Sequence, residues 1–331
     1  MIPELVRQSA EEFQLKEAIA QRYAVDRESI ILYQEIGLFL AELFKALQSP
    51  HGRIVAAAPA IAEIALAADR ADAELIDSES NELCEDNLDS LKSKIKSSGD
   101  IIYLANPNRL TGATWANAQL KTLAALVSDG LLIVDEYYHD FSRLTALPLL
   151  NKYRNLILLR AFEDWTKASQ FDPGYAIMSE QLLDKFKNTS NSCGIERAAA
   201  KKCYDIMADR NSCDNRIELI QKQALQVARE LTKIGVKCQL CPTNFILLQA
   251  GQPGEIQEFL KTRGIKADSL VQGGAAQKYL RIQISGSDQD HRIIEAFLRM
   301  PAALLNSQAK QFRSPGTIAG SNQAKAKSTS I

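Results

Sequence analysis

The stretch from Asn155 to Tyr175, NLILLRAFEDWTKASQFDPGY, holds side chains that could do covalent or acid–base chemistry. Lys167 carries an amine, which can form an imine with a carbonyl group. Asp164, three residues earlier, carries a carboxylate, which cannot form an imine but could act as a base. An apolar run at residues 155–159 comes first, so we expect a buried strand that leads into a charged loop.

The cysteines offer a second kind of chemistry, metal binding or redox exchange. Cys238 and Cys241 form a lone CxxC pair. A zinc site would need a second pair of ligands, and the three histidines, His51, His139 and His291, are scattered. We therefore expect no metal site and two ordinary thiols at the entry of a strand, with redox use of the pair as the alternative. In an intracellular chain of this size, free thiols are more typical than a disulfide framework.

Size and charge bound the possibilities. At 331 residues the chain is long enough for about two domains, and 46% hydrophobic with 24% charged residues allow a normal core. The net charge of −1 provides no overall basic field for nucleic acid or a membrane surface. No apolar run approaches the ~18–20 residues of a membrane span, and the polar N-terminal residues do not resemble a signal peptide. We expect a cytoplasmic protein.

Short apolar runs alternate with helical patterns through the first half of the chain. Residues 53–58, 100–104 and 131–134 read as buried strands, and residues 59–68 and 115–127 between them read as helices. This alternation predicts βαβ units, that is, an α/β fold whose mainly parallel sheet is flanked by helices on both faces.

We expect four segments along the chain. Residues 1–24 form an N-terminal helical segment, residues 25–185 a large α/β domain, and residues 186–300 a smaller C-terminal α+β domain. Residues 301–331 carry four Lys or Arg and no acidic residue, and are rich in Ser, Ala, Gln and Gly. That composition predicts a disordered tail, whose charge offers a weak route to nucleic acid or an acidic partner.

Four spaced segments together resemble one known family. They are Asn106-Pro-Asn-Arg-Leu-Thr-Gly112, Ile133-Val-Asp-Glu-Tyr-Tyr-His-Asp-Phe141, the stretch Asn155–Tyr175, and Leu280-Arg-Ile-Gln-Ile-Ser-Gly286. In order and spacing they are similar to fold-type I, pyridoxal-phosphate (PLP) dependent aminotransferases of classes I and II. Histidinol-phosphate aminotransferase and its threonine-phosphate decarboxylase relatives are the most similar. The resemblance covers residues 15–300 and implies the fold of that family.

The resemblance implies roles for three residues that this chain retains. Asp135 matches the carboxylate that faces the pyridine nitrogen, and Tyr138 matches the tyrosine that bonds the phenolic oxygen of the cofactor. Arg281 matches the arginine that holds the substrate carboxylate. Two of these residues also have a purely structural interpretation. Asp135 could bond loop amides at a strand end, and Arg281 could form a salt bridge within the small domain.

Other family positions are replaced. Aligned without gaps, the Ser-Lys pair of the family falls on Glu163-Asp164, and its phosphate-binding arginine falls on Asp172. The asparagine that contacts the ring falls on Arg109, and the proline after it on Leu110. Asp164 could serve as a base in place of the lysine only if the cofactor were held.

The expected phosphate cradle also differs from the family pattern. Its Gly-Ser/Ala-Asp turn falls on Glu35-Ile36-Gly37, and the ring-stacking aromatic falls on Ile61. Two like unit charges at ~4 Å repel by about 4 kcal/mol at an effective dielectric near 20, so Glu35 alone would weaken phosphate binding about a thousandfold. The resemblance therefore predicts a degenerate active site in which PLP is lost or weakly bound.

Our first functional hypothesis is an aminotransferase-like protein that is inactive or impaired and acts in binding or regulation. It would form a homodimer, as the family does, or partner an active relative. Arg109 and Arg281 could hold a small carboxylate ligand, and the acidic residues could suit an amine.

A second hypothesis is an active PLP-dependent aminotransferase of histidinol-phosphate type. It would use Lys167, because Thr166-Lys167 resembles the Ser-Lys pair displaced by three residues. A third, minor hypothesis is an interaction protein that acts through its basic tail.

Overall fold

The structure is a computed structural model. It describes residues 9–47, 52–79, 88–162, 173–189, 194–270, 278–287, 290–301 and 304. Asp164, Lys167 and Asp172 lie outside the described residues, and so does almost all of the predicted tail.

Within the described residues, the larger of two sheets has seven strands in the order β1-β7-β6-β5-β4-β2-β3. Its strands are β1 (Ile30–Tyr33), β2 (Arg53–Ala56), β3 (Glu74–Asp77), β4 (Ile101–Ala105), β5 (Leu131–Asp135), β6 (Leu156–Ala161) and β7 (Gly174–Met178). The pairs β2–β3, β2–β4, β4–β5 and β5–β6 are parallel, and β7 runs antiparallel to both β6 and β1. The predicted mainly parallel sheet is confirmed.

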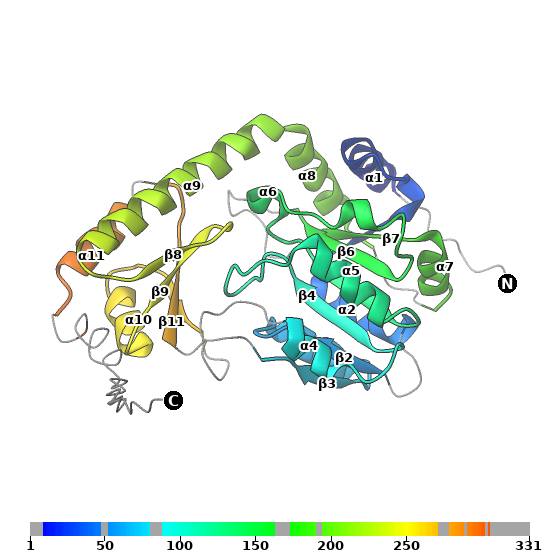
Figure 1. Ribbon diagram of the computed structural model, residues 1–331. Coiled ribbons are helices and arrows are strands. Elements are labelled where there is room, and N and C mark those ends of the chain that lie inside the picture. Colours follow the sequence, from blue (N-terminus) through cyan, green and yellow to red (C-terminus); the bar gives the residue numbers. More distant parts are fainter. Residues whose placement is uncertain are drawn as a thin grey trace, which may run out of the picture.

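Helices cover both faces of this sheet (Figure 1). One face packs against α2 (Ile36–Leu47), α3 (Ala62–Arg70) and α7 (Glu180–Thr189). The other packs against α1 (Ala10–Tyr23), α4 (Leu88–Lys94), α5 (Asn117–Leu126) and α8 (Arg197–Ala208). The short α6 (His139–Ser142) follows β5, and 3₁₀ turns lie at Arg27–Ser29 and Leu147–Leu149. Because both faces are covered, the central strands β4 and β5 are buried along their whole length, and alternate residues enter the two cores.

The smaller sheet is antiparallel, with the strand order β10-β11-β9-β8. Its strands are β8 (Cys238–Leu240), β9 (Phe245–Gln249), β10 (Ala267–Ser269) and β11 (Tyr279–Gln283). Three helices pack on it: α9 (Arg210–Lys233), α10 (Pro253–Lys261) and α11 (His291–Leu298). In Figure 1, α9 is the long helix that leads from α8 to this sheet.

Two elements differ from the sequence patterns. The helix expected from Pro59 begins only at Ala62, because residues 58–61 form an extended turn that contains the cis Ala58–Pro59 bond. No strand is predicted at Gly174–Met178, yet β7 lies between β1 and β6. A Cβ at Gly174 would lie 2.4 Å from both the Arg160 carbonyl oxygen and the Tyr33 ring, so this close approach depends on glycine.

The two sheets meet at the turn after β4. Gly112 has a φ of +72°, and a Cβ there would lie 2.4 Å from the Cβ of Cys241, which follows β8. The Cys241 thiol donates to the Thr111 carbonyl oxygen at 3.3 Å. Among the described residues, no helix has the length and apolar character needed to cross a membrane.

Replacing Gly112 with alanine tests this contact. We expect Gly112→Ala to lower the free energy of unfolding by about 2–4 kcal/mol, because the new Cβ meets Cys241 and the left-handed backbone is strained. Gly235→Ala is the matched control. Gly235 has a φ of +86° but no atom near its would-be Cβ, so it should cost only about 1–2 kcal/mol. Urea unfolding measures both, and equal losses would contradict the close contact.

Candidate functional site

Asp135 lies at the carboxyl end of β5 and is fully buried. Its Oδ2 accepts hydrogen bonds from the Tyr103 hydroxyl at 2.6 Å and from Arg109 Nε at 2.8 Å. Its Oδ1 accepts from the Tyr137 amide at 3.1 Å and from Arg109 Nη2 at 3.4 Å. A carboxylate offers about four acceptor positions, so the chain itself fills all of them.

Arg109 reaches Asp135 because two buried asparagines shape the turn after β4. The Asn108 side chain accepts from the amides of Leu110 and Thr111 and donates to the Pro59 carbonyl oxygen. The Asn106 side chain exchanges two hydrogen bonds with the backbone of Trp115. These bonds fix the backbone on both sides of Arg109, so its side chain is directed back toward the end of β5.

The buried charges affect the pKa values of Arg109 and Tyr103. Burial alone would lower the pKa of Arg109, but the Asp135 carboxylate outweighs it, so the pKa lies above the ordinary arginine value. Burial, followed by the Asp135 charge, raises the pKa of Tyr103 well above its usual range. Tyr103 therefore stays neutral and donates its proton. The guanidinium also lies over the Tyr137 ring, with 3.9 Å between the Arg109 Cζ and the ring centroid.

Arg281 contacts the same turn from the smaller sheet. Its Nη1 donates to the Arg109 carbonyl oxygen at 3.1 Å, and its Nη2 forms a 2.8 Å ion pair with Asp268 on the neighbouring strand β10. The salt bridge that we weighed for Arg281 is therefore present. The guanidinium keeps an exposed fraction of 25%, so part of it still faces the pocket described below.

Tyr138 points to the smaller sheet as well. Its hydroxyl donates to Asn244 Oδ1 at 3.0 Å, just before β9. Burial raises the pKa of Tyr138 to about 12, so the hydroxyl remains a hydrogen-bond donor throughout the physiological range.

A second buried ion pair holds the next residue along the chain. Glu136 accepts from Arg160 Nε at 2.9 Å, from the Thr145 hydroxyl at 3.0 Å and from the Ala146 amide at 2.6 Å. Both charged side chains are almost fully buried. The pair joins the ends of β5 and β6, and thereby fixes the strand end that carries Asp135.

Acidic side chains stand at the start of two helices on the other side of the site. Glu35 precedes α2, and its carbonyl oxygen accepts from the Phe39 amide. A Cβ at Gly37 would lie 3.6 Å from the Cβ of Glu63 and 3.8 Å from a Glu35 carboxylate oxygen, so both acidic residues approach the same helix end. Helix N-termini attract anions, and here the carboxylates of Glu35 and Glu63 are the anions near the helix starts.

A pocket of about 370 Å³ lies between these groups. It is lined by Ala60, Ile61, Ala62, Glu63, Arg109, Leu110, Tyr137, Tyr138 and Arg281. Its volume falls within the usual range for small-molecule sites. The pocket thus gathers Arg109, Tyr138 and Arg281, all singled out from the sequence, with Asp135 behind Arg109.

Four contributors escaped the sequence patterns: Tyr103, Asn244, Asp268 and Glu63. Tyr103 gives the clearest signal, because it is a hydroxyl-bearing residue in a buried strand next to the strand that ends in Asp135. The other three gain their roles only from tertiary contacts.

The four cysteines that the structure describes, Cys203, Cys213, Cys238 and Cys241, do not line the pocket beside Arg109. Burial raises the pKa of Cys238 to about 11. Among the described residues, no group of His, Cys, Asp and Glu side chains is arranged to hold a metal ion.

Comparisons with known proteins agree on one family. Residues 10–297 match the family model described as aminotransferase class I and II. A histidinol-phosphate aminotransferase of Geobacillus sp. (strain WCH70) is 27% identical over 305 residues, which cover 86% of this chain and 80% of that protein. Another, from Carboxydothermus hydrogenoformans, is 29% identical over 211 residues, which are 63% of this chain and 59% of its own length.

Solved structures show the same fold. The histidinol-phosphate aminotransferase of Clostridium acetobutylicum superposes with a TM-score of 0.76 at 17% identity, covering 92% of both chains. The Sinorhizobium meliloti enzyme in complex with pyridoxal-5'-phosphate also gives 0.76, at 18% identity, covering 91% of this chain and 82% of that one. The resemblance inferred from the sequence is confirmed at the level of family and fold.

The described residues do not fit a pyridoxal phosphate group. A protonated ring nitrogen requires a carboxylate with a free acceptor position, and the acceptor positions of Asp135 are filled. A phosphate dianion requires positive or neutral groups at the helix starts, where Glu35 and Glu63 stand.

Replacing Arg109 tests how much the Arg109–Asp135 ion pair contributes to stability. We expect Arg109→Met to lower the free energy of unfolding by about 3–5 kcal/mol, because it leaves a buried carboxylate without its cation. Adding Asp135→Asn in the same chain should recover a large part of that loss. Lys201→Met is the control. It breaks an exposed pair with Asp205 and should cost under about 1 kcal/mol. Equal costs for Arg109→Met and Lys201→Met in urea unfolding would contradict the buried pair.

Proposed function

Because the chain belongs to the class I and II aminotransferase family, we propose that it is a member that no longer performs PLP-dependent amino transfer. It keeps the family fold and acts as a binding or regulatory protein. The observation that carries this proposal is the Arg109–Asp135 ion pair, which occupies the carboxylate that the family turns toward the cofactor ring.

Three further observations support the proposal. In an alignment without gaps the Schiff-base position of the family falls on Asp164, and a carboxylate cannot form an imine. Glu35 and Glu63 place negative charge where a phosphate would need a cradle. The Arg281 guanidinium already donates hydrogen bonds to the Asp268 carboxylate and to the Arg109 carbonyl oxygen.

The pocket beside Arg109 is the site that we assign to a ligand. The exposed quarter of the Arg281 side chain, with the positive charge of Arg109 beside it, favours a small carboxylate, and Glu63, which also lines the pocket, favours an amine. The protein works in the cytoplasm, as a homodimer or beside an active relative, in keeping with the assembly expected for its family.

Cofactor binding is the direct test. We expect purified protein mixed with PLP to show no visible imine absorbance and no stoichiometric adduct after borohydride reduction and peptide mapping. Lys167→Ala should give the same result as the unaltered chain. The unaltered chain should also show no amino transfer from histidinol phosphate. A stoichiometric adduct on Lys167, lost in Lys167→Ala, would establish the active enzyme that uses the displaced lysine instead.

A second variant asks whether Arg109 is the cause. Arg109→Asn frees the Asp135 carboxylate, so we expect non-covalent PLP affinity, measured by fluorescence quenching, to rise by about tenfold or more. Arg292→Asn removes an arginine on the exposed face of α11 and should leave the affinity unchanged. No difference between the two variants would show that Arg109 is not what excludes the cofactor.

A further inference from the structure

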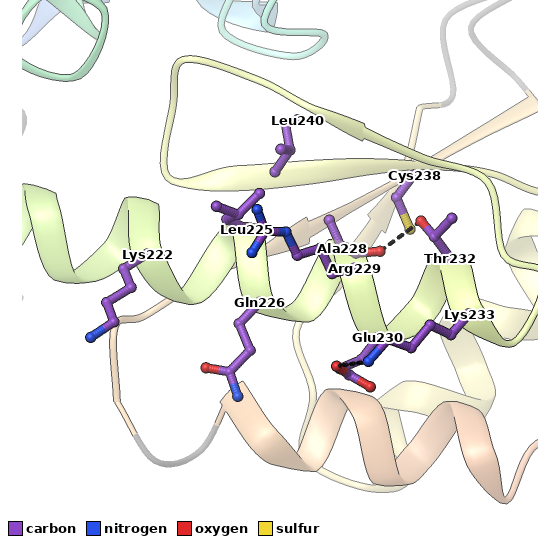
Figure 2. A pocket seen from close by; sticks show the side chains of 10 residues that line it. All are labelled: Lys222, Leu225, Gln226, Ala228, Arg229, Glu230, Thr232, Lys233, Cys238 and Leu240. Carbon is purple, nitrogen blue, oxygen red and sulfur yellow. Dashed lines mark hydrogen bonds and ion pairs between the residues drawn. The ribbon is translucent and has the colours of Figure 1, made fainter.

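A groove lies beside β8, on the smaller sheet and away from the Arg109 pocket. It has a volume of about 780 Å³ and is lined by residues of α9 and β8. Figure 2 shows Leu225 and Arg229 of α9 directed toward the strand, and Cys238 of β8 next to Thr232. No residue of the site described above takes part in this groove.

β8 is an edge strand, because within the described sheet it pairs only with β9. The Gln249 amide donates to the Lys237 carbonyl oxygen at 3.0 Å, which makes Lys237–Gln249 a hydrogen-bonded pair. In an antiparallel ladder the backbone N–H and C=O groups of successive residues point alternately to the two sides of the strand. The backbone groups of Gln239 therefore also face β9, while those of Cys238 and Leu240 face the open edge. Such an edge is a template for another extended segment.

The side chains at this edge supply an apolar surface. Cys238 and Leu240 are two residues apart, so both face α9, and both line the groove. Leu240 has an exposed fraction of 48%, and Leu225 is only partly buried. An apolar side chain of an added strand would remove both leucines from water.

The charge around the groove is positive. Lys222, Arg229 and Lys233 line it against a single acidic residue, Glu230, and the Glu230–Lys233 pair neutralises itself at 2.6 Å. Neither Lys222 nor Arg229 forms an ion pair with any residue that the structure describes. Both are exposed. They therefore favour a negatively charged occupant.

We propose that the β8–α9 groove binds an acidic, extended segment of a partner protein, which adds a strand to the edge at Cys238 and Leu240. One of its apolar side chains packs on Leu225 and Leu240, and its carboxylates lie near Lys222 and Arg229. The proposal stands apart from the loss of cofactor chemistry, since it involves neither Asp135 nor PLP.

A synthetic peptide provides the probe. We expect the full chain to bind a fluorescently labelled eight-residue peptide of alternating glutamate and valine, measured by fluorescence anisotropy, with affinity that falls as salt is added. The double variant Lys222→Glu, Arg229→Glu should weaken binding by about tenfold or more. The double variant Lys121→Glu, Lys185→Glu carries the same change in net charge at exposed sites on α5 and α7, and should bind as the unaltered chain does.

Backbone methylation separates strand addition from charge attraction alone. Two peptides are compared, one N-methylated at every odd residue and the other at every even residue. In an extended peptide these two sets of amides point to opposite edges, so only one of the two peptides has its amides blocked on the side that faces β8. We expect that peptide to lose binding and the other to keep it. Absence of binding, equal binding by both double variants, or equal binding by both methylated peptides would overturn the proposal. Analytical ultracentrifugation of the same variants tests whether a second copy of the chain occupies the groove instead. A dimer lost only in Lys222→Glu, Arg229→Glu, without peptide binding, would assign the groove to a second copy of the chain.

Discussion

The buried ion pair between Asp135 and Arg109 links the two halves of the molecule. Asp135 ends the central strand β5, and Arg109 lies in the turn after β4, where Asn106 and Asn108 fix the backbone. Arg281 of the smaller sheet holds the carbonyl oxygen of the same Arg109 and is itself held by Asp268. A buried charge requires a partner, so neither Asp135 nor Arg109 can move away without leaving the other as an unpaired buried charge.

Under the proposed function, the same pair explains how the family fold can persist without PLP-dependent chemistry. In the family pattern the position of Arg109 is an asparagine, which leaves the strand-end carboxylate open to a cationic ring. An arginine at that position brings a permanent positive charge into the protein itself. The guanidinium satisfies Asp135, stacks on Tyr137 and leaves the sheet framework intact. Under the proposed function no phosphate has to be held at the starts of α2 and α3, so the acidic residues there are compatible with that arrangement.

Most strands of the two sheets could be predicted from the sequence, because apolar runs of four or five residues indicate buried strands without any knowledge of tertiary contacts. Four motifs in register point to Asp135, Tyr138 and Arg281 as candidate site residues. The partner of Arg109 could not be predicted, because it depends on a turn whose shape comes from Asn108 reaching Pro59, 49 residues away. The strand at Gly174–Met178 was missed for a similar reason: its place between β1 and β6 rests on a close approach at Gly174 that local pattern does not reveal.

The most direct measurement is a crystal structure of the protein grown with excess pyridoxal phosphate. The account predicts that the Arg109 guanidinium remains within hydrogen-bonding distance of Asp135 and that no cofactor density lies between Asp135 and Glu35. A cofactor ring whose nitrogen contacts Asp135, with Arg109 displaced and Lys167 joined to the ring aldehyde carbon, would contradict it.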